Sequence, residues 1–384
     1  MDFSLTPEQE QMRGVVRAFA ERELRPQYTH WDRTGIFPLD LWRRMGELGF
    51  CGARVAPEYD GQGLDALTTG LICEEVARGD FNLAYAPFMT ALVCEVLQSY
   101  ATPAIKDAWL RPMARGQAII ALALTEPGAG SDAKAMRSRA SRDGDSYVLS
   151  GEKTGISLAI VADAAVVFAK TDPEAGARGV SAFLMPLDIP GVSRTPIHDM
   201  GHRAVQRGSI FMDDVRLPAE NLIGPEGRGF YQVMQGFDFS RFLIGLICLA
   251  AAAVSLDETM AYVKGREAFG KPLAQFEGVS FTIAEQATLI EAARWLCYRG
   301  LLLRDAGLPH TKEAAMVKWL APKTAVDAIH DCLLLHGHYG YTQELPLEQR
   351  LRDVIGLEIG DGTAQVQKMI VARELLGRES LPYS

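Results

Sequence analysis

Apolar residues recur at helical spacing in the first third of the chain, where Val15, Val16 and Phe19 fall on one helical face. Thr6 is the expected N-cap of this first helix, and Gln9, three residues later, would complete a capping box. The same period predicts further helices at residues 39–48 and 66–78 and through the nineties. The first third is therefore expected to be helical.

The pattern changes near residue 118. Short apolar runs between Gly, Pro and Asp residues follow, and they predict strands at 118–124, 165–170, 180–185 and 208–215. A hairpin is expected across 135–151, with Asp143 and Gly144 at its turn.

Helical spacing returns at Arg228 and continues to the end of the chain. Long helices are expected at 229–264, 277–306 and 311–336, and a last helix at 364–376 that Gly377 ends. The predicted fold is an α+β multidomain chain. It has an N-terminal helical domain (1–118), a middle β domain (119–227) and a C-terminal four-helix-bundle-like domain (228–384).

The composition narrows the classes of partner. The 384 residues carry a formal net charge of −9, which argues against binding to nucleic acid or to anionic lipid. The six cysteines form no C-x-x-C pair and are expected to be buried free thiols in a reducing compartment. The longest apolar run, 242–254, is shorter than the roughly 20 residues of a membrane span. With no signal-peptide pattern, a cytoplasmic protein is expected.

Two stretches carry candidate chemistry. "LALTEPGAGSDA" (122–133) superficially matches the dinucleotide fingerprint, but a hairpin follows it where a βαβ unit would place a helix. Its glycines bare backbone N–H groups beside Thr125 and Ser131, which suits an anionic or heterocyclic group. A simple Pro-Gly turn between strands explains the stretch about equally well. "GLEIGDGTAQVQ" (356–367) sets Asp361 between glycines, as a turn residue or as a catalytic base.

These stretches resemble parts of the acyl-CoA dehydrogenase family. "TEPGAGSD" is similar to the flavin-binding signature of that family. Further matches follow in order: "DDVRLPAENLIG" (213–224), "GRGF" (227–230), "REAFGKPL" (266–273) and "GDGTAQVQKMIVARELLG" (360–377). The helical, β, helical order of three domains is also that of the family.

The resemblance implies a homotetramer with one FAD per subunit that dehydrogenates an acyl-CoA thioester between its α- and β-carbons. In this family a carboxylate removes the α-proton while the β-hydride passes to flavin N5. Electrons then leave to an electron-transferring flavoprotein. The thioester is polarised by a flavin hydroxyl and by the backbone N–H of the base residue, because its α-C–H is a very weak acid.

Carried over by position, the resemblance makes Asp361 the base and places Gly362 beside the thioester. Asp238 and Arg241 would hold the CoA portion, and Ser131 would also approach the ligand. The implied cofactor positions are Leu122, Leu124, Thr125, Gly130, Ser131, Gly155, Ser157, Arg266, Phe269, Leu334, Gly337, His338, Thr363 and Gln365. Of these, Arg266 and Phe269 would reach an FAD in the neighbouring subunit.

Each residue taken alone has a plainer interpretation. Arg266 suits a solvated helix charge and Phe269 a core aromatic. Thr363 suits the N-cap of the last helix. Asp238 and Arg241 suit an ion pair across one helical turn. It is the joint appearance of these residues that favours the functional interpretation.

The sequence departs from the family at positions that bear on the substrate. The usual base is Glu, so Asp361 is one methylene shorter, and Gly360 stands where Tyr is frequent. Gly155 replaces a flavin-packing aromatic residue, while Leu334 and His338 replace Gln and Gly. A shorter base needs a closer α-carbon, and the glycines leave room for a ring.

A cyclic substrate is therefore expected. Relatives that oxidise cyclohexane-carbonyl-CoA or cyclohexene-carbonyl-CoA use Asp as the base. The expected reaction converts cyclohexane-1-carbonyl-CoA to cyclohex-1-ene-1-carbonyl-CoA. The stretch 81–93, expected to line the acyl site, contains no second acid, which favours 1,2-dehydrogenation.

Two other functions stay open at this point. One is a flavin oxidase of the same fold that resembles nitroalkane oxidase, which also uses an Asp base. The other is a non-catalytic scaffold that binds FAD or acyl-CoA. A metal site is not expected, because His336 and His338 have no spaced Cys or carboxylate partners.

Overall fold

The computed structural model describes residues 4–380. Its first part is helical: α1 (Pro7–Phe19), α2 (Tyr28–Thr34), α3 (Leu39–Glu47), α4 (Ala66–Gly79), α5 (Tyr85–Tyr100) and α6 (Pro103–Ala114). A π-helical turn continues α1 to Leu24. The predicted capping box is confirmed. The Gln9 N–H donates to Thr6 Oγ1 at 3.2 Å, and the Thr6 N–H donates to Gln9 Oε1 at 3.0 Å.

The middle part is one mixed sheet. Its strands are β1 (Ile120–Ala123), β2 (Arg139–Asp143), β3 (Ser146–Ile156), β4 (Ala164–Lys170), β5 (Val180–Pro186), β6 (Val192–Pro196), β7 (Gly208–Pro218) and β8 (Leu222–Ile223). They lie in the order β6-β7-β3-β2-β4-β5-β8, and β1 pairs in parallel with β4. β2 and β3 form the predicted hairpin, in which Asp143 pairs with Ser146.

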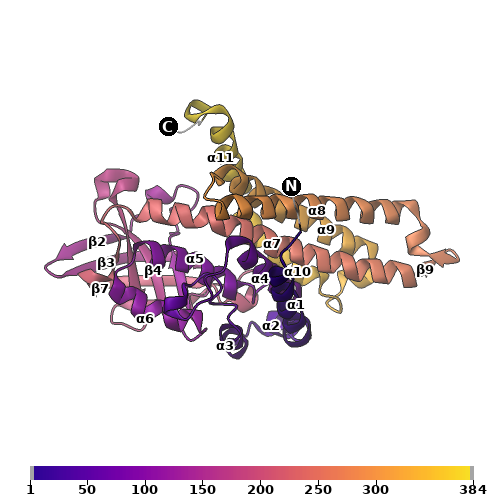
Figure 1. Cartoon of the computed structure of the whole chain (residues 1–384), viewed down its shortest axis with the longest axis horizontal. Coiled ribbons are helices and arrows are strands. Elements are labelled where there is room, and N and C mark those ends of the chain that lie inside the picture. The colour runs from indigo at the N-terminus through magenta and orange to yellow at the C-terminus, as the bar shows by residue number, and fades with distance from the viewer. Residues whose placement is uncertain (1–3, 381–384) are drawn as a thin grey trace.

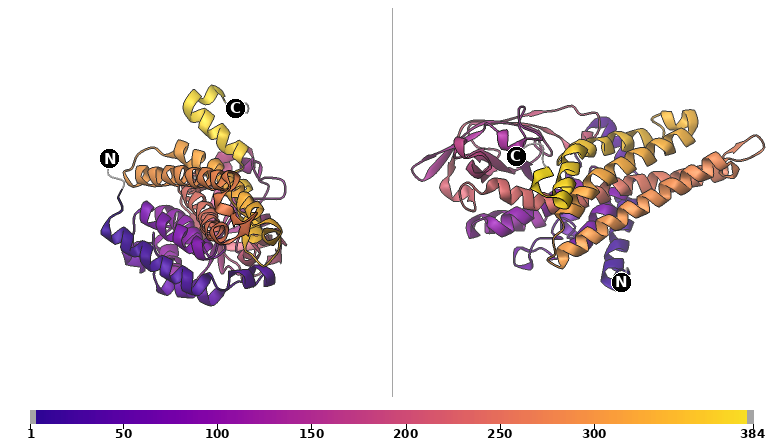
Figure 2. Two further views of the ribbon diagram at one scale, coloured as in Figure 1. Left: turned by 90° about the vertical axis from the view of Figure 1, so that its right-hand side faces the viewer. Right: turned by 90° about the horizontal axis from the view of Figure 1, so that it is seen from above.

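The last part is a helical bundle of α7 (Gly229–Gly265), α8 (Glu277–Asp305), α9 (Thr311–Leu335), α10 (Leu347–Ile359) and α11 (Ala364–Leu376). A small hairpin of β9 (Glu267–Ala268) and β10 (Lys271–Pro272) joins α7 to α8. Figure 1 shows this hairpin at the opposite end of the molecule from the main sheet. Helix α11 projects away from the body, as Figure 1 and the left view of Figure 2 show. The helical, β, helical architecture confirms the predicted fold class.

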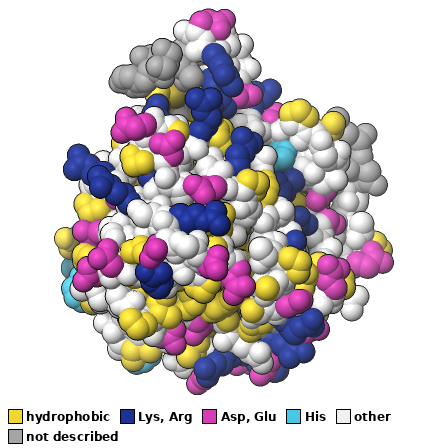
Figure 3. Space-filling view, turned by 90° about the vertical axis from the view of Figure 1, so that its left-hand side faces the viewer, with side chains coloured by type: hydrophobic (Ala, Val, Ile, Leu, Met, Phe, Trp, Pro, Cys, Tyr) yellow, Lys and Arg dark blue, Asp and Glu magenta, His cyan; other side chains and the backbone are white. Residues whose placement is uncertain are grey.

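Helix α7 is the centre of the molecule and packs against α4, α5, α8 and α9. By length and composition α7 could cross a membrane, but its most apolar stretch is wholly buried in the protein. A helix that is apolar on all sides suits this central position. The six cysteines are buried and free, as predicted. Figure 3 shows Lys and Arg side chains interspersed with Asp and Glu over the sheet end of the molecule.

Three helices of the structure were not predicted from the sequence. Helix α10 was not expected as a separate element, and neither were α2 and α6. The secondary structure changes between α6 and β1 and again between β8 and α7. The domain limits at 118/119 and 227/228 themselves stay predictions.

Candidate active site

A left-handed turn between α10 and α11 carries Asp361. Asp361 has a φ of 56° and Gly362 a φ of 91°, and the left-handed conformation is uncommon for a residue with a side chain. Thr363 then caps α11, because its hydroxyl accepts the Val366 N–H at 3.4 Å. The turn points the Asp361 carboxylate at the central helix α7, where the Ser240 hydroxyl donates to Oδ2 at 3.2 Å.

Charged groups from three other elements face this carboxylate. Burial raises the pKa of Asp361 above its ordinary value of 3.8, while the charges of Lys318, Arg241 and Arg207 and the hydrogen bond from Ser240 oppose the rise. Lys318 comes from α9, Arg241 from α7 and Arg207 from the segment before β7. The arrangement holds a partly buried carboxylate among cations, which is the environment of a group that accepts a proton.

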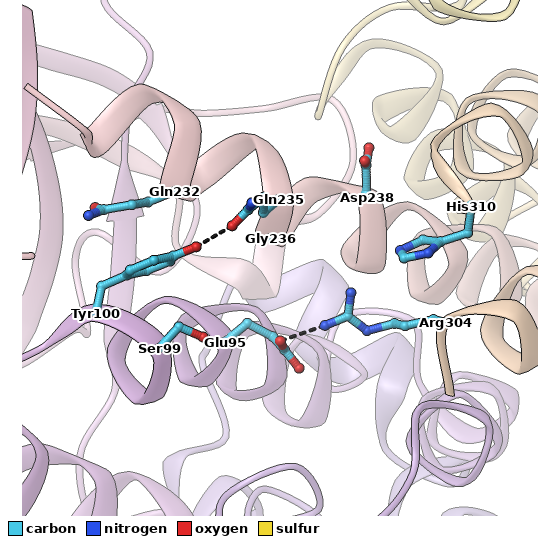
Figure 4. A pocket seen from close by; sticks show the side chains of 9 residues that line it. All are labelled: Glu95, Ser99, Tyr100, Gln232, Gln235, Gly236, Asp238, Arg304 and His310. Carbon is cyan, nitrogen blue, oxygen red and sulfur yellow. Dashed lines mark hydrogen bonds and ion pairs between the residues drawn. The ribbon is translucent and has the colours of Figure 1, made fainter. Parts of the chain in front are cut away.

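A cavity of about 340 Å³ lies beside α7. Figure 4 shows Asp238 and His310 at one end of the cavity and Tyr100, bonded to Gln235, at the other. Asp238 is held in place by Arg241 Nη1 at 2.8 Å and by the Thr311 hydroxyl at 2.6 Å. The predicted CoA-binding pair therefore forms the ion pair expected from its spacing, and the Asp238 member lines the cavity.

The loop after β1 is built on a buried ion pair. The Lys153 ammonium lies 2.7 Å from Glu126 Oε1 and donates to the Leu124 carbonyl at 3.1 Å. Glu126 also accepts the backbone N–H groups of Arg137 and Ser138. Burial opposes ionisation of Glu126, but Lys153 and these donors outweigh it and lower its pKa. The pair joins both sides of the glycine loop to β3.

This loop is not a Rossmann loop. After Gly128 and Gly130 the chain forms only a single 3-10 turn, Ala133–Ala135, and then enters β2. The loop is tied to β3 by the Thr154 N–H, which donates to the Thr125 carbonyl at 2.9 Å. The sequence argument against a dinucleotide fingerprint is confirmed.

The end of β3 carries Gly155, and Ser157 directly follows the strand. Gly155 is exposed, with a φ of 66° and open space where a Cβ would stand. Arg207 Nη2 donates to the Ser157 hydroxyl at 3.4 Å, and the same Arg207 faces Asp361. One arginine therefore connects the strand end that carries Ser157 with the turn that carries Asp361.

The other candidate cofactor residues lie at the far end of the bundle. Arg266 and Phe269 are on the β9–β10 hairpin, and Phe269 is 97% exposed, so its interpretation as a core aromatic is wrong. Leu334 lies in the last turn of α9, Gly337 and His338 follow that helix, and all three are exposed as well. Within one chain these residues and the glycine loop are at opposite ends (Figure 1).

Comparison with known proteins identifies the family. Residues 6–117, 121–215 and 227–376 match, in turn, the N-terminal, middle and C-terminal domains of the acyl-CoA dehydrogenases. The chain belongs to the acyl-CoA dehydrogenase family. The short-chain specific acyl-CoA dehydrogenase of Clostridium acetobutylicum is 37% identical to it over 378 residues, which are 98% of this chain and 100% of the relative.

Solved structures agree with this family. The butyryl-CoA dehydrogenase of Megasphaera elsdenii has a TM-score of 0.95 and 34% identity, with coverage of 98% of this chain and 100% of that one. An FAD complex of PigA has a TM-score of 0.94 and 30% identity, with the same coverage. As a member of the family, this acyl-CoA dehydrogenase is an FAD-dependent oxidoreductase that acts on a CH–CH bond of an acyl-CoA.

Sequence reasoning missed the cations that organise the site. Lys153, Lys318 and Arg207 were not among the candidate residues, and neither was Glu126. For two of these residues the sequence did hold a signal. Lys153 lies within a stretch that predicts a strand, and Lys318 lies within an Ala-rich stretch that predicts a helix. Fully buried lysines are rare unless they are paired, but burial itself cannot be read from the sequence.

The buried pair beneath the glycine loop makes a testable prediction. Lys153→Met leaves the Glu126 carboxylate buried without its cation, so we expect a loss of about 3–5 kcal/mol in the free energy of unfolding. We also expect a lower FAD content per chain, because the loop is no longer held against β3. Denaturant unfolding and the flavin absorbance of the purified protein measure the two effects.

Two further variants test whether the loss of stability comes from the Lys153–Glu126 ion pair itself. Lys134→Met changes an exposed lysine near the same loop and should have no effect. The double variant Glu126→Gln/Lys153→Met should recover part of the stability, because it removes both charges and keeps a side-chain oxygen that can accept a backbone N–H of Arg137 or Ser138. A Lys153→Met protein that is as stable as the wild type would contradict the prediction.

Proposed function

We propose that Asp361 is the base that removes the α-proton of an acyl-CoA thioester. The observation that carries this proposal is the partly buried Asp361 carboxylate, which is bonded to Ser240 and faces three cations. One of these cations, Arg241, pairs with Asp238, which lines the cavity. The cations keep the carboxylate ionised, and partial burial raises its pKa, so it is a stronger base than a surface carboxylate.

The main chain of the same turn supports the reaction. The hydrogen bonds of residues 4–380 include none donated by the Asp361 backbone N–H, so this group is available to a ligand. An N–H directed at the thioester oxygen stabilises the negative charge that develops when the α-proton leaves. FAD, which enzymes of this family use, supplies the acceptor for the hydride from the β-carbon.

The residues at the sheet end of the molecule fit a flavin cofactor. A Cβ at Gly128, Gly130 or Gly155 would meet nothing within 4 Å, which leaves the backbone open to a large ring system and to phosphate groups. The proposed contacts on this side are Leu122, Leu124, Thr125, Gly130, Ser131, Gly155, Ser157, Thr363 and Gln365. Ser131 and Gly362 would also border the substrate, and Asp238 and Arg241 would hold its CoA portion.

A second group of proposed contacts comes from a neighbouring subunit. Arg266 and Phe269 lie on a hairpin that projects from the end of the bundle (Figure 1). An almost fully exposed phenylalanine suits a surface that another chain or a ligand covers. Leu334, Gly337 and His338 lie at the same end, since His336 stacks on Tyr262 with ring centroids 4.2 Å apart. We propose a homotetramer in which these residues complete the FAD site of another subunit.

The proposed acyl group is compact and cyclic. Asp361 reaches one methylene less far than a glutamate, so the α-carbon has to lie closer to the turn. A Cβ on Gly360 would have its nearest neighbour at 3.5 Å and one on Gly155 would have none, which leaves room for a ring. Cyclohexane-1-carbonyl-CoA, oxidised to cyclohex-1-ene-1-carbonyl-CoA, fits this geometry. A straight short-chain acyl-CoA is the second candidate, because the relatives named above act on short chains.

The proposed role of Asp361 predicts a loss of turnover in Asp361→Asn. The amide has nearly the same shape but cannot accept the proton, so kcat should fall by about 10²–10⁴-fold while FAD stays bound. Anaerobic bleaching of the flavin by substrate measures the step, and Asp327→Asn, on the exposed side of α9, is the control. Slow reoxidation on mixing with air is expected if an electron-transferring flavoprotein is the natural acceptor, whereas fast reoxidation favours the oxidase alternative.

The pH dependence follows from the same carboxylate. Catalysis needs the ionised form, and the pKa of Asp361 is raised above 3.8, so kcat should be full above this raised pKa and fall as the pH drops through it. An acid limb at or below 3.8, or an Asp361→Asn variant with wild-type turnover, would contradict the assignment. A variant that lacks activity and also lacks FAD would point to a structural role for Asp361.

A panel of acyl-CoAs with an artificial electron acceptor tests the acyl group. We expect a higher kcat/KM for cyclohexane-1-carbonyl-CoA than for butyryl-CoA. Gly360→Tyr should fill the space and reverse this preference by about tenfold or more. Gly14→Tyr, where a Cβ also meets nothing within 4 Å, is the matched control. A wild type that prefers butyryl-CoA supports the second candidate.

Mixed assemblies test whether Arg266 acts across subunits. Arg266→Ala and Asp361→Asn chains should each be inactive alone, the first through weak FAD binding. Refolded together, they should regain part of the activity, because an intact Asp361 in one chain meets an intact Arg266 from the other. Absence of any recovery in a confirmed mixed tetramer would place both residues in the site of one chain.

A further inference from the structure

Lys318 lies next to the turn that carries Asp361, and the reaction proposed above counts it only as one of the three cations that face the carboxylate. The residue is on α9 and is completely buried. Its ammonium donates to the Leu357 carbonyl at 2.7 Å and to the Gly362 carbonyl at 3.2 Å. Leu357 belongs to the last turn of α10, whose carbonyls lack helical partners. One side chain therefore holds the backbone on both sides of Asp361.

The turn needs such support because its conformation is uncommon. Asp361 and Gly362 are consecutive residues in the left-handed region, and a non-glycine residue stays there only when its surroundings fix it. Gln367 supplies a second tie, since Nε2 donates to the Asp361 carbonyl at 3.0 Å and to the Gly362 carbonyl at 3.2 Å. Without these bonds the carboxylate would not be confined to the direction of Ser240.

Lys318 differs from the other two cations that face Asp361 in its ion pairing. Arg241 is neutralised by Asp238 and Arg207 by Asp199, each at 2.8 Å. Within residues 4–380, no carboxylate lies within ion-pair distance of the Lys318 ammonium. Its charge is therefore available to the base.

Other titratable groups also lie near Lys318 and Asp361. Around Lys318 the nearby titratable groups are Asp361, the Cys248 thiol of α7, Arg241 and Glu358 of α10. Around Asp361 they also include Tyr85 of α5, whose pKa burial raises. Burial lowers the pKa of Lys318 to about 8, and the charge of Asp361 opposes this effect, so the two groups stabilise each other's ionised forms.

We propose that Lys318 is the positioning residue of the catalytic base: it fixes the left-handed turn and supplies the positive charge that keeps the Asp361 carboxylate ionised. This inference rests on the proposed role of Asp361 as the base. It gives the lysine a part in catalysis without contact to substrate or cofactor, through the direction and the charge state of another side chain.

Two variants separate the effect of the Lys318 charge from the effect of the hydrogen bonds to the backbone carbonyls of the turn. Lys318→Met removes the charge and both hydrogen bonds at nearly the same length. Its kcat should fall on the order of 10- to 100-fold, with a smaller change in KM. The acid limb of its pH profile should move to higher pH, because the carboxylate has lost an attractive charge. Gln367→Leu removes the other two backbone bonds and no charge, so it should lower kcat and leave the acid limb in place.

The controls keep a structural role distinguishable. Lys323→Met, on the exposed side of the same helix and bonded to Asp327, should behave as the wild type. Lys318→Gln, which can donate one hydrogen bond without charge, should show the full shift of the acid limb and a smaller fall in kcat. All variants are compared as FAD-loaded, assembled protein.

Different results would overturn this inference and the proposed function. A Lys318→Met protein with wild-type kcat and an unmoved acid limb overturns the inference. Loss of FAD from both the Met and the Gln variants also overturns it, because it would assign Lys318 to the fold alone. If Asp361→Asn retains full turnover, it is the proposed function that fails, whatever the Lys318 variants do.

Discussion

The left-handed turn at Asp361 and Gly362 is the constraint on which the rest of the site depends. It reverses the chain between α10 and α11 and directs a carboxylate from near the end of the sequence toward the centre of the bundle, where Ser240 of α7 bonds it. The conformation persists because Lys318 and Gln367 bond its carbonyls. A turn that is fixed by side chains from two helices can hold an acid in one direction, which proton transfer requires.

Buried charges recur along the path from the glycine loop to this turn, and most are balanced by an adjacent partner. Lys153 is paired with Glu126, Arg241 with Asp238 and Arg207 with Asp199. Such pairs position groups more than they stabilise the fold, because desolvation offsets much of their attraction. Asp361 stands apart, since it faces several cations and bonds only to a hydroxyl. An ionised carboxylate without an ion-pair partner of its own is free to take up a proton.

The proposed cofactor contacts of one chain lie in two separate places. The glycine loop joins strands of the main sheet, whereas the β9–β10 hairpin with the exposed Phe269 is at the opposite end of the molecule (Figure 1). This separation gives the exposed phenylalanine a physical reason in an assembly of several chains. The open space where a Cβ would stand on Gly155 and the missing side chain at Gly360, together with the short acid, are the features behind the proposed choice of a compact acyl group.

The sequence alone determined the long elements and the chemical candidates. Helical periodicity placed α7, α8, α9 and α11 to within one or two residues, and Asp143 and Gly144 marked the β2–β3 hairpin, because these signals are local. The glycines around Asp361 showed an acid on open backbone. Helix α10 was missed although it is as long as α11, because Pro346 stands at its N-cap and it lacks the start signal that Thr363 gives α11.

The tertiary structure alone decided which groups surround that acid. Lys318 bonds carbonyls that are 39 and 44 residues away in the chain, and Arg207 reaches Ser157 from 50 residues away, so no local pattern could reveal either contact. Burial and ion pairing depend on the packing of whole elements. They are what turn a short aspartate in a glycine-rich turn into a candidate base.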